Sequence, residues 1–257
     1  MFHVQTVSGP IAPDALGHSQ IHEHIFVHRT PMAEKNPALR LDDPARSLEE
    51  LRAYRAALPR LGAEYVETLV LDVTPHAGGY RVATRNGDYF CRRLVLAAGL
   101  ANRRFARFAV PDLPVYPDKG QVLLVERLPM VMPIPVLGAT QTFGGTVIIG
   151  FKHERVGHDS GVVPASVATE GRWAMRVWPE LAKKRLIRTW SGLRVMPEDN
   201  MAIYSRLPGH PQVSLINTHS AVTMAAAHSR LLPDFILGGE LPETARGMTL
   251  KRFGFAC

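Results

Sequence analysis

The sequence predicts a mixed fold of the α+β / α/β class, with more antiparallel strand than a plain doubly wound sheet contains. In the middle of the chain, short apolar segments alternate with glycine-bearing turns. Two helical patterns occur in the last third, and a hairpin with one helix precedes the middle region. With 257 residues, 46% of them hydrophobic, the chain can form one large domain or two smaller ones with a real core.

The first sixty residues predict a hairpin, a strand and a helix. The hairpin is expected at HVQTVSGPIA and the strand at SQIHEHIFV. Ser47 is placed as a helix N-cap with Glu50 three residues later, the spacing of a capping box. Apolar residues then recur with helical spacing through LEELRAYRAALPRLG.

From Gly62 onward the pattern changes to strand, turn and strand. Gly78-Gly79 and Asn86-Gly87 are the strongest hairpin signals in the chain, within EYVETLVLDVTPHAGGYRVATRNGDYFCRRLVLAAG. Later elements are expected in this order: strands at GQVLLVERL and TFGGTVIIGFKHE, a helix at VATEGRWAMRVWPELAKKR, a strand at HPQVSLINT and a helix at AVTMAAAHSRLLPDFILGG.

Charge and cysteine content narrow the functional classes. The formal net charge is +7, and we interpret it as a basic surface that suits an anionic cofactor; the basic residues are scattered, so we expect no nucleic acid partner. The two cysteines, Cys91 and Cys257, do not suggest a disulfide framework, which fits a reducing compartment. The apolar stretches are too short to span a membrane and the N-terminus lacks a signal-peptide pattern. We therefore expect a cytoplasmic protein with no membrane partner.

The stretch QIHEHIF places His22 and His24 on the same face of a strand. With VQTVSGPIAPDALGHSQIHEHIFV, NPALRLDD and LEELRAYRAA in order, this region resembles the start of the phosphotriesterase family of binuclear metal hydrolases. The likeness covers residues 3–57, within an N-terminal fragment assigned to residues 1–57. It implies the first strand and helix of a TIM barrel, with both histidines as ligands of a divalent metal such as zinc.

The remaining ligands of such a metal site are missing from the pattern. The family also uses a bridging lysine, two further histidines and an aspartate from later barrel strands, and no strand–helix alternation here supplies them. Because two ligands do not make a catalytic centre, we expect His22 and His24 to be vestigial strand residues. A metal-dependent hydrolase is the alternative function.

Residues 61–257 resemble the C-terminal part of the D-amino-acid-oxidase-like flavoprotein family, which includes glycine oxidase and sarcosine oxidase. The resemblance rests on six segments in order: LGAEYVETLVLDV, GGYRVATRNGDYFCRRLVLAAGLAN, YPDKGQVLLVE, GTVIIGFKHE, WPELAKKRLIRTWSGLRVMPED and NTHSAVTMAAAHSRLLPDFILG. It implies a partial FAD-binding, Rossmann-like domain and an antiparallel-sheet substrate domain over about residues 115–190. The implied reaction is oxidation of a small amine or amino acid by hydride transfer to FAD.

The same resemblance assigns residues to the site. Arg194, in SGLRVMPED, takes the position of a catalytic arginine that contacts the substrate carboxylate or the flavin side of the site. The positions expected to bind the cofactor are Val70 near the adenine, Ala98 and Gly99 near the phosphate or ribose, and His219, Ala221, Val222, Thr223 and Met224 near the flavin.

One half of the expected cofactor site is missing. No strand–Gly-x-Gly-x-x-Gly–helix motif occurs, although this motif holds the pyrophosphate of a dinucleotide. The chain therefore resembles a fusion of a hydrolase fragment with a truncated oxidase. Its FAD site is expected to be incomplete, and we expect the chain to be inactive alone. A partner chain that completes the flavin domain, and a non-catalytic remnant or subunit, both stay open.

Overall fold

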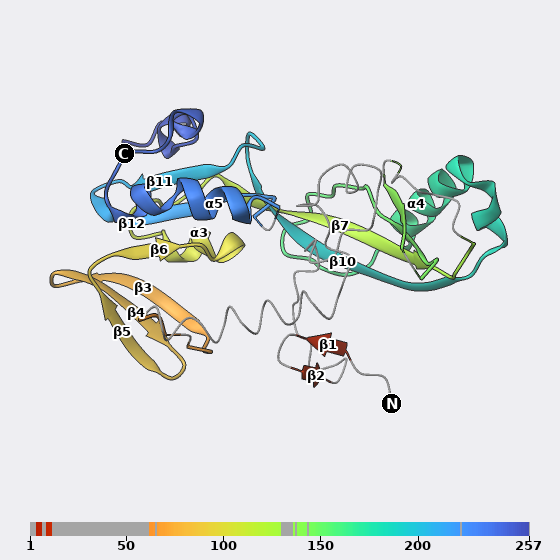
Figure 1. The fold of residues 1–257 in the computed structure, drawn as a ribbon, viewed down its shortest axis with the longest axis horizontal. Helices are drawn as coiled ribbons and strands as arrows, with labels where there is room; N and C mark the ends of the chain where they lie inside the picture. Colours follow the sequence, from red (N-terminus) through yellow and green to blue (C-terminus); the bar gives the residue numbers. More distant parts are fainter. Residues whose placement is uncertain are drawn as a thin grey trace. The chain divides into compact units, whose positions relative to one another are not determined.

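The computed structural model describes residues 4–6, 9–11, 62–64, 66–129, 136, 138–142, 144–221 and 223–256. Among them are two compact units, one containing residues 119–193 and the other residues 66–118 and 194–256 (Figure 1). Strands β7 (Val115–Val125) and β10 (Leu186–Pro197) each have residues in both units. We call the first of these unit 1 and the second unit 2.

The hairpin at the N-terminus is confirmed. Strands β1 (Val4–Thr6) and β2 (Gly9–Ile11) pair antiparallel, with Val4 opposite Ile11. The strand expected around His22 and His24 and the helix expected from Ser47 lie outside the described residues. The TIM-barrel start implied by the resemblance is therefore not shown.

In unit 2, the two glycine turns form where the sequence predicts them. Strands β3 (Val70–His76), β4 (Gly79–Thr84) and β5 (Gly87–Cys91) make an antiparallel meander. Gly78 and Gly87 have φ of 75° and 130°, a region that glycine enters without steric cost. β3 starts later than the apolar run from Glu64 suggests: its first paired residue is Val70, opposite Thr84, and one further backbone hydrogen bond joins the Arg85 N–H to the Leu69 carbonyl at 2.9 Å.

A second sheet of unit 2 has the strand order β11-β12-β6 (Figure 1). β11 (Ile203–Leu207) pairs antiparallel with β12 (His210–Asn217), and β12 pairs parallel with β6 (Leu94–Leu96). Alternate residues of these strands face one core, since Leu96, Ile203, Val213 and Leu215 are all buried in the same cluster. The short helices η4 (Gly99–Ala101) and α3 (Asn102–Phe105) follow β6.

The helical pattern expected over AVTMAAAHSRLLPDFILGG forms two helices. α5 (Ala225–Leu231) and α6 (Pro233–Leu237) meet at Pro233, whose ring cannot continue the preceding helix. Leu232 and Phe235 pack with Tyr204 of β11 in a third apolar cluster. The helices η6 (Glu243–Ala245) and η7 (Leu250–Phe253) complete the unit.

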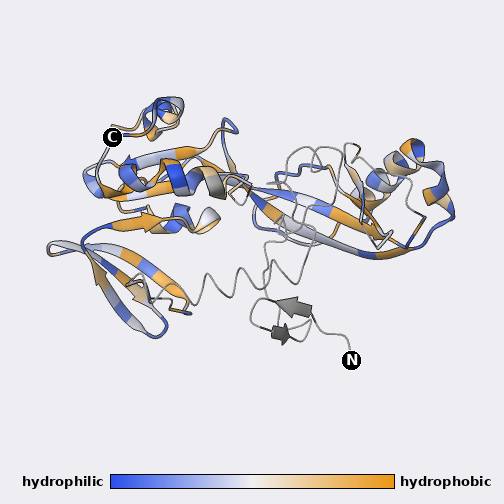
Figure 2. Ribbon diagram, viewed as in Figure 1, coloured by the Kyte–Doolittle hydropathy of each residue, from blue (hydrophilic) through white to orange (hydrophobic). Residues whose placement is uncertain are grey.

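In unit 1, the sheet has the order β10-β7-β9-β8. β8 (Ala139–Gln141) and β9 (Val147–Ile149) pair antiparallel, and the helices α4 (Pro164–Val177) and η5 (Pro179–Lys183) follow. Leu123, Ile149 and Ala174 belong to its core, and apolar stretches are visible on its strands in Figure 2. Within the described part of the chain, no helix has the length and apolar character needed to cross a membrane.

Candidate functional site

The carboxyl ends of β6 and β12 lie side by side in unit 2. Because the strands are parallel, with Leu96 opposite Leu215, the segments that follow them leave the sheet at the same edge. These segments are Ala97–Gly99 and Thr218–Ser220, two of the regions that the sequence assigns to the cofactor. Ligands of open α/β sheets bind outside such carboxyl ends.

Asn102 ties the two strand ends together. Its side chain is fully buried, and its Oδ1 accepts a hydrogen bond from the backbone N–H of Ala98 at 3.0 Å. Its Nδ2 lies 2.6 Å from Asn217 Oδ1 and 3.3 Å from the carbonyl oxygens of both Leu96 and Ile216. One buried amide therefore fixes β6 against β12 and orients Asn217.

The segment after β12 forms a turn before α5 begins. The Met224 N–H donates to the Ser220 carbonyl at 3.0 Å, and His219 Nδ1 lies 2.9 Å from Ser220 Oγ. Ala221 and Thr223 are exposed, while Val222 lies outside the described residues. The residues expected near the flavin are therefore in a turn, and the helix starts only at Ala225.

Arg194 lies on β10 within reach of an acidic side chain. Its Nη1 is 3.7 Å from Asp118 Oδ2, and the two side chains are 16% and 3% exposed. The next residue, Val195, packs against Gly99, just after the end of β6. The contact is close: a Cβ added to Gly99 would lie 3.2 Å from Val195 Cγ2. Gly99 has φ of 58°, which further favours glycine there. The chain thus brings β10 at Val195, the residue next to Arg194, close to the end of β6.

The remaining candidate residues are not brought to this edge. Val70 begins β3, is partly buried and packs on the core of unit 2. His22 and His24 lie outside the described residues. In the ranges that the structure describes, no group of three or more histidine, cysteine, aspartate or glutamate side chains could hold a metal ion.

The strand ends fit one side of a bound dinucleotide. Ala97 and Ala98 are exposed and small, so no bulky side chain of their own covers the backbone at the end of β6. Backbone groups at such a strand end can approach a phosphate or ribose closely. The sequence has no Gly-x-Gly-x-x-Gly motif, the pattern of the loop that holds the pyrophosphate of a dinucleotide.

A buried tyrosine–histidine pair supports the segment after β12. Tyr204 OH lies 2.8 Å from His228 Nε2, which joins β11 to α5. Burial raises the pKa of Tyr204 and lowers the pKa of His228, which disfavours the charged form of each side chain. A neutral imidazole nitrogen can accept or donate a hydrogen bond according to its tautomer, so it suits this contact.

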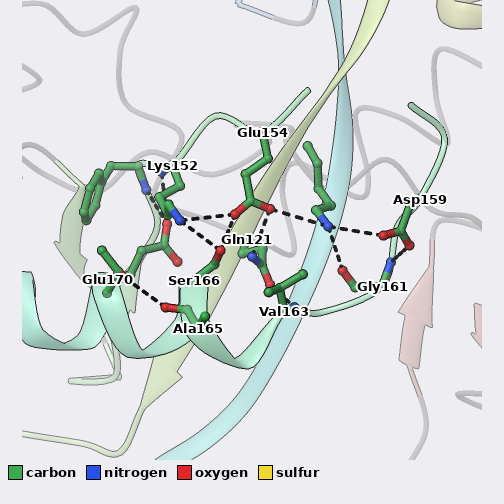
Figure 3. Close-up of polar contacts among 12 residues, drawn as sticks. Gln121, Lys152, Glu154, Asp159, Gly161, Val163, Ala165, Ser166 and Glu170 are labelled. Carbon is green, nitrogen blue, oxygen red and sulfur yellow. Dashed lines mark hydrogen bonds and ion pairs between the residues drawn. The ribbon is translucent and has the colours of Figure 1, made fainter. Parts of the chain in front are cut away.

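Unit 1 contains a cluster of polar side chains around a fully buried lysine. Lys119 Nζ donates to the Gly161 carbonyl at 3.1 Å and lies 3.5 Å from Glu154 Oε2 and 3.6 Å from Asp159 Oδ2 (Figure 3). Gln121, on the same strand, donates to Glu154 Oε2 at 3.2 Å and accepts from the Val163 N–H at 2.7 Å. A buried lysine is stable only when paired in this way.

Helix α4 contributes two further side chains, Ser166 and Glu170, to this cluster. Ser166 Oγ donates to Glu154 Oε1, and Lys152 Nζ contacts both, which holds the pKa of Glu154 below its ordinary value (Figure 3). Glu170, also on α4, accepts the N–H groups of Phe151 and Lys152 at 3.0 Å each. These bonds fasten the segment 151–163 between β7 and α4, so we interpret the cluster as structural.

The sequence alone does not single out Asn102, Asp118 or Lys119. Asn102 stands three residues after Gly99, and Asp118 and Lys119 lie inside YPDKGQ. Asn102 has two partners nearby, Ala98 and Leu96, but Asn217, Arg194 and Gly161, which Asn102, Asp118 and Lys119 contact, are far away in sequence, so spacing gives no sign of these long-range contacts. A polar residue shortly after an apolar strand end is the one available signal for Asn102.

Comparison with known proteins identifies the family. A family model described as FAD dependent oxidoreductase, DAO, matches residues 43–234. A subunit of opine oxidase from Agrobacterium tumefaciens (strain Ach5) is 30% identical over 213 residues, which is 82% of this chain and 57% of the relative. Glycine oxidase of Pseudomonas putida is 25% identical over 201 residues, covering 76% of this chain and 55% of the relative.

The fold agrees with this family. The crystal structure of glycine oxidase from Geobacillus kaustophilus superposes with a TM-score of 0.68 at 22% identity, over 80% of this chain and 57% of that one. This chain spans little more than half the length of these relatives.

The family match reaches further toward the N-terminus than the resemblance drawn from the sequence. It starts at residue 43, inside the fragment assigned to residues 1–57, so the flavoprotein similarity begins before residue 61. The helical pattern predicted in LEELRAYRAALPRLG is compatible with both families, which is why it could not decide between them. The phosphotriesterase resemblance receives no support. The chain belongs to the family of FAD-dependent oxidoreductases, whose cofactor is FAD.

Proposed function

We propose that this chain forms the C-terminal part of a flavin-dependent oxidase or dehydrogenase that acts on a small amine or amino acid. The observation that carries this proposal is the meeting of three segments in unit 2: the end of β6, the end of β12 and the Arg194 region of β10. Relatives named as a glycine oxidase and as a subunit of opine oxidase support the substrate class.

Arg194 is proposed to bind the substrate carboxylate. A guanidinium presents a planar pair of N–H donors that match the two oxygens of a carboxylate. Asp118, almost fully buried, holds Arg194 from one side and limits its rotation. When bound, the flavin supplies the chemistry by accepting a hydride from the substrate carbon. The residues of this chain position the substrate and shield it from water.

Ala98, Gly99 and the turn from His219 to Met224 are proposed to contact the cofactor. The exposed backbone after β6 suits the phosphate or ribose, and the turn after β12 suits the flavin ring. A partner chain with the strand–Gly-x-Gly-x-x-Gly–helix unit is proposed to complete the site. The opine oxidase relative is itself named as one subunit of its enzyme, which supports an assembly of chains.

The visible absorption spectrum of the purified protein, with metal analysis of the same sample, tests this function. We expect flavin bands at about 370 and 450 nm when the chain is co-expressed with the N-terminal part of its opine oxidase relative, and weak or no bands for the chain alone. Stoichiometric zinc without flavin would instead support the metal-dependent hydrolase. A colourless, metal-free protein in both preparations would contradict the proposal and identify a non-catalytic remnant or subunit.

A further inference from the structure

Unit 2 contains a pocket of about 790 Å³ lined by Gly78, Gly79, Tyr80, Arg92, Arg93 and Gln212. Arg93 directly precedes β6, and Gln212 precedes Val213, the residue of β12 that pairs with Leu94. The pocket therefore lies at the amino ends of these parallel strands, whereas the candidate cofactor edge lies at their carboxyl ends. Its volume is in the range of small-molecule sites, about 300–1,000 Å³.

One backbone contact and one side-chain contact shape this pocket. A Cβ on Gly79 would lie 2.2 Å from the Cys91 carbonyl oxygen, so only glycine allows β4 to pair with β5 there. Tyr80 OH lies 3.1 Å from His210 Nδ1, which joins the meander to the start of β12. The walls thus come from both sheets of unit 2 and are held together by a partly buried contact.

The pocket carries two positive charges and no acidic lining residue. Arg92 and Arg93 are exposed, and neither makes a hydrogen bond or ion pair with the residues that the structure describes. Other arginines of this unit are paired, such as Arg252 with Asp199 at 2.6 Å and Arg81 with Asp88 at 2.7 Å. The Arg93 guanidinium lies beside Gly238 at the end of α6, and neither guanidinium group has an acidic partner among the described residues, so both charges can pair with a ligand.

We propose that this pocket binds a small organic phosphate, with the phosphoryl oxygens held by Arg92 and Arg93. A phosphate group carries close to two negative charges and three terminal oxygens, which match two guanidinium groups better than a single carboxylate does. The side-chain amide of Gln212 adds a neutral hydrogen-bonding group beside them. The volume leaves room for an organic portion beyond the phosphate. This site is separate from the proposed flavin site.

Calorimetric titration with inorganic pyrophosphate, at constant ionic strength, tests the proposal on the full chain without added flavin. We expect saturable binding to one site. The R92Q/R93Q variant should bind at least about 10-fold more weakly, because each lost charge-assisted hydrogen bond contributes about that factor. R172Q/R176Q removes the same charge from α4 in unit 1 and should bind like the wild type.

Two further titrations make the outcome decisive. R92K/R93K keeps both positive charges but loses the paired N–H donors of the guanidinium groups, so pyrophosphate binding should weaken several-fold. Wild-type affinity in this variant would overturn the proposed site, because charge alone would then explain the binding. Succinate should bind at least about 10-fold more weakly than pyrophosphate, and equal affinity would overturn the phosphate assignment. An absence of saturation in the wild-type chain would overturn the whole proposal. Far-UV circular dichroism and melting curves confirm that each variant is folded.

Discussion

Asn102 is the residue on which the geometry of the two strand ends depends most directly. Replacing it with alanine leaves the Ala98 N–H without its acceptor and Asn217 Oδ1 without its donor. The contact with Asn217 is buried and the one with Ala98 is partly buried, and a buried group left unpaired costs about 1–3 kcal/mol, so we expect Asn102→Ala to lower the free energy of unfolding by about 2–4 kcal/mol. Urea unfolding followed by circular dichroism measures this loss. The exposed helix residue Arg230 provides the control, since Arg230→Ala should change stability by less than about 0.5 kcal/mol.

Arg194→Lys separates charge from geometry at the proposed substrate site. Lysine keeps the positive charge but cannot form two parallel hydrogen bonds to a carboxylate. In the flavin-loaded assembly we expect KM for an amino-acid substrate to rise about 10-fold or more, with a smaller change in kcat. An amine substrate without a carboxylate should be unaffected. Equal effects on both substrates would show that Arg194 has a structural role only.

At the scale of single elements, tight turns can be predicted from the sequence, but the pairing of strands that are far apart in the chain cannot. Gly78 and Gly87 mark turns whose backbone conformation only a few residue types favour, so the meander follows from the sequence. β10 is not predicted as a strand because its burial does not alternate: it is exposed from Leu186 and buried toward Pro197. Because its burial increases along its length, the sequence lacks the alternation of apolar and polar residues on which strand prediction depends.

The ion pair between Asp199 and Arg252 joins the turn after β10 to η7. Arg252 Nε lies 2.6 Å and Nη2 3.0 Å from the two carboxylate oxygens, and Nη2 also donates to the Met201 carbonyl at 2.8 Å. The hydrogen bonds from Arg252 lower the pKa of Asp199 below its ordinary value of 3.8. The unfolded chain therefore takes up this proton more readily than the folded chain does.

It follows that the stabilisation by this pair is complete above the unfolded pKa and is lost as the pH falls through the lowered folded value. We expect Asp199→Asn to reduce stability by about 1 kcal/mol at neutral pH, with the difference from the wild type shrinking toward about pH 3 and below. Urea unfolding at both pH values tests this. Asp88→Asn removes the more exposed Arg81–Asp88 pair and should change stability little at either pH. A difference for Asp199→Asn that does not depend on pH would contradict the electrostatic explanation.

For the whole molecule, the sequence is enough to assign the family, but it does not reveal every residue that holds the candidate site together. Six short motifs in order predict a flavoprotein, and the family match over residues 43–234 confirms it. The N-terminal hydrolase resemblance depends on His22, His24 and a common helix pattern, and it is not supported. Asn102, Asp118 and Lys119 each contact at least one residue in a distant segment, so these roles emerge only when the chain is folded.

The sheet of unit 2 provides a test of the proposed partner chain. Among the described strands β6 lies at the edge, with β12 on one side, and its Val95 is 39% exposed. An edge strand has N–H groups without sheet partners, so β6 should exchange amide hydrogens faster than the central β12 in the chain alone. If the Gly-x-Gly-x-x-Gly half adds a strand beside β6, co-expression should slow exchange in residues 94–96 while leaving β12 and the meander of β3–β5 nearly unchanged. Hydrogen exchange followed by mass spectrometry resolves these segments. Exchange in β6 that is already as slow as in β12 would mean that another part of this same chain covers the edge, and the partner would then have to bind elsewhere.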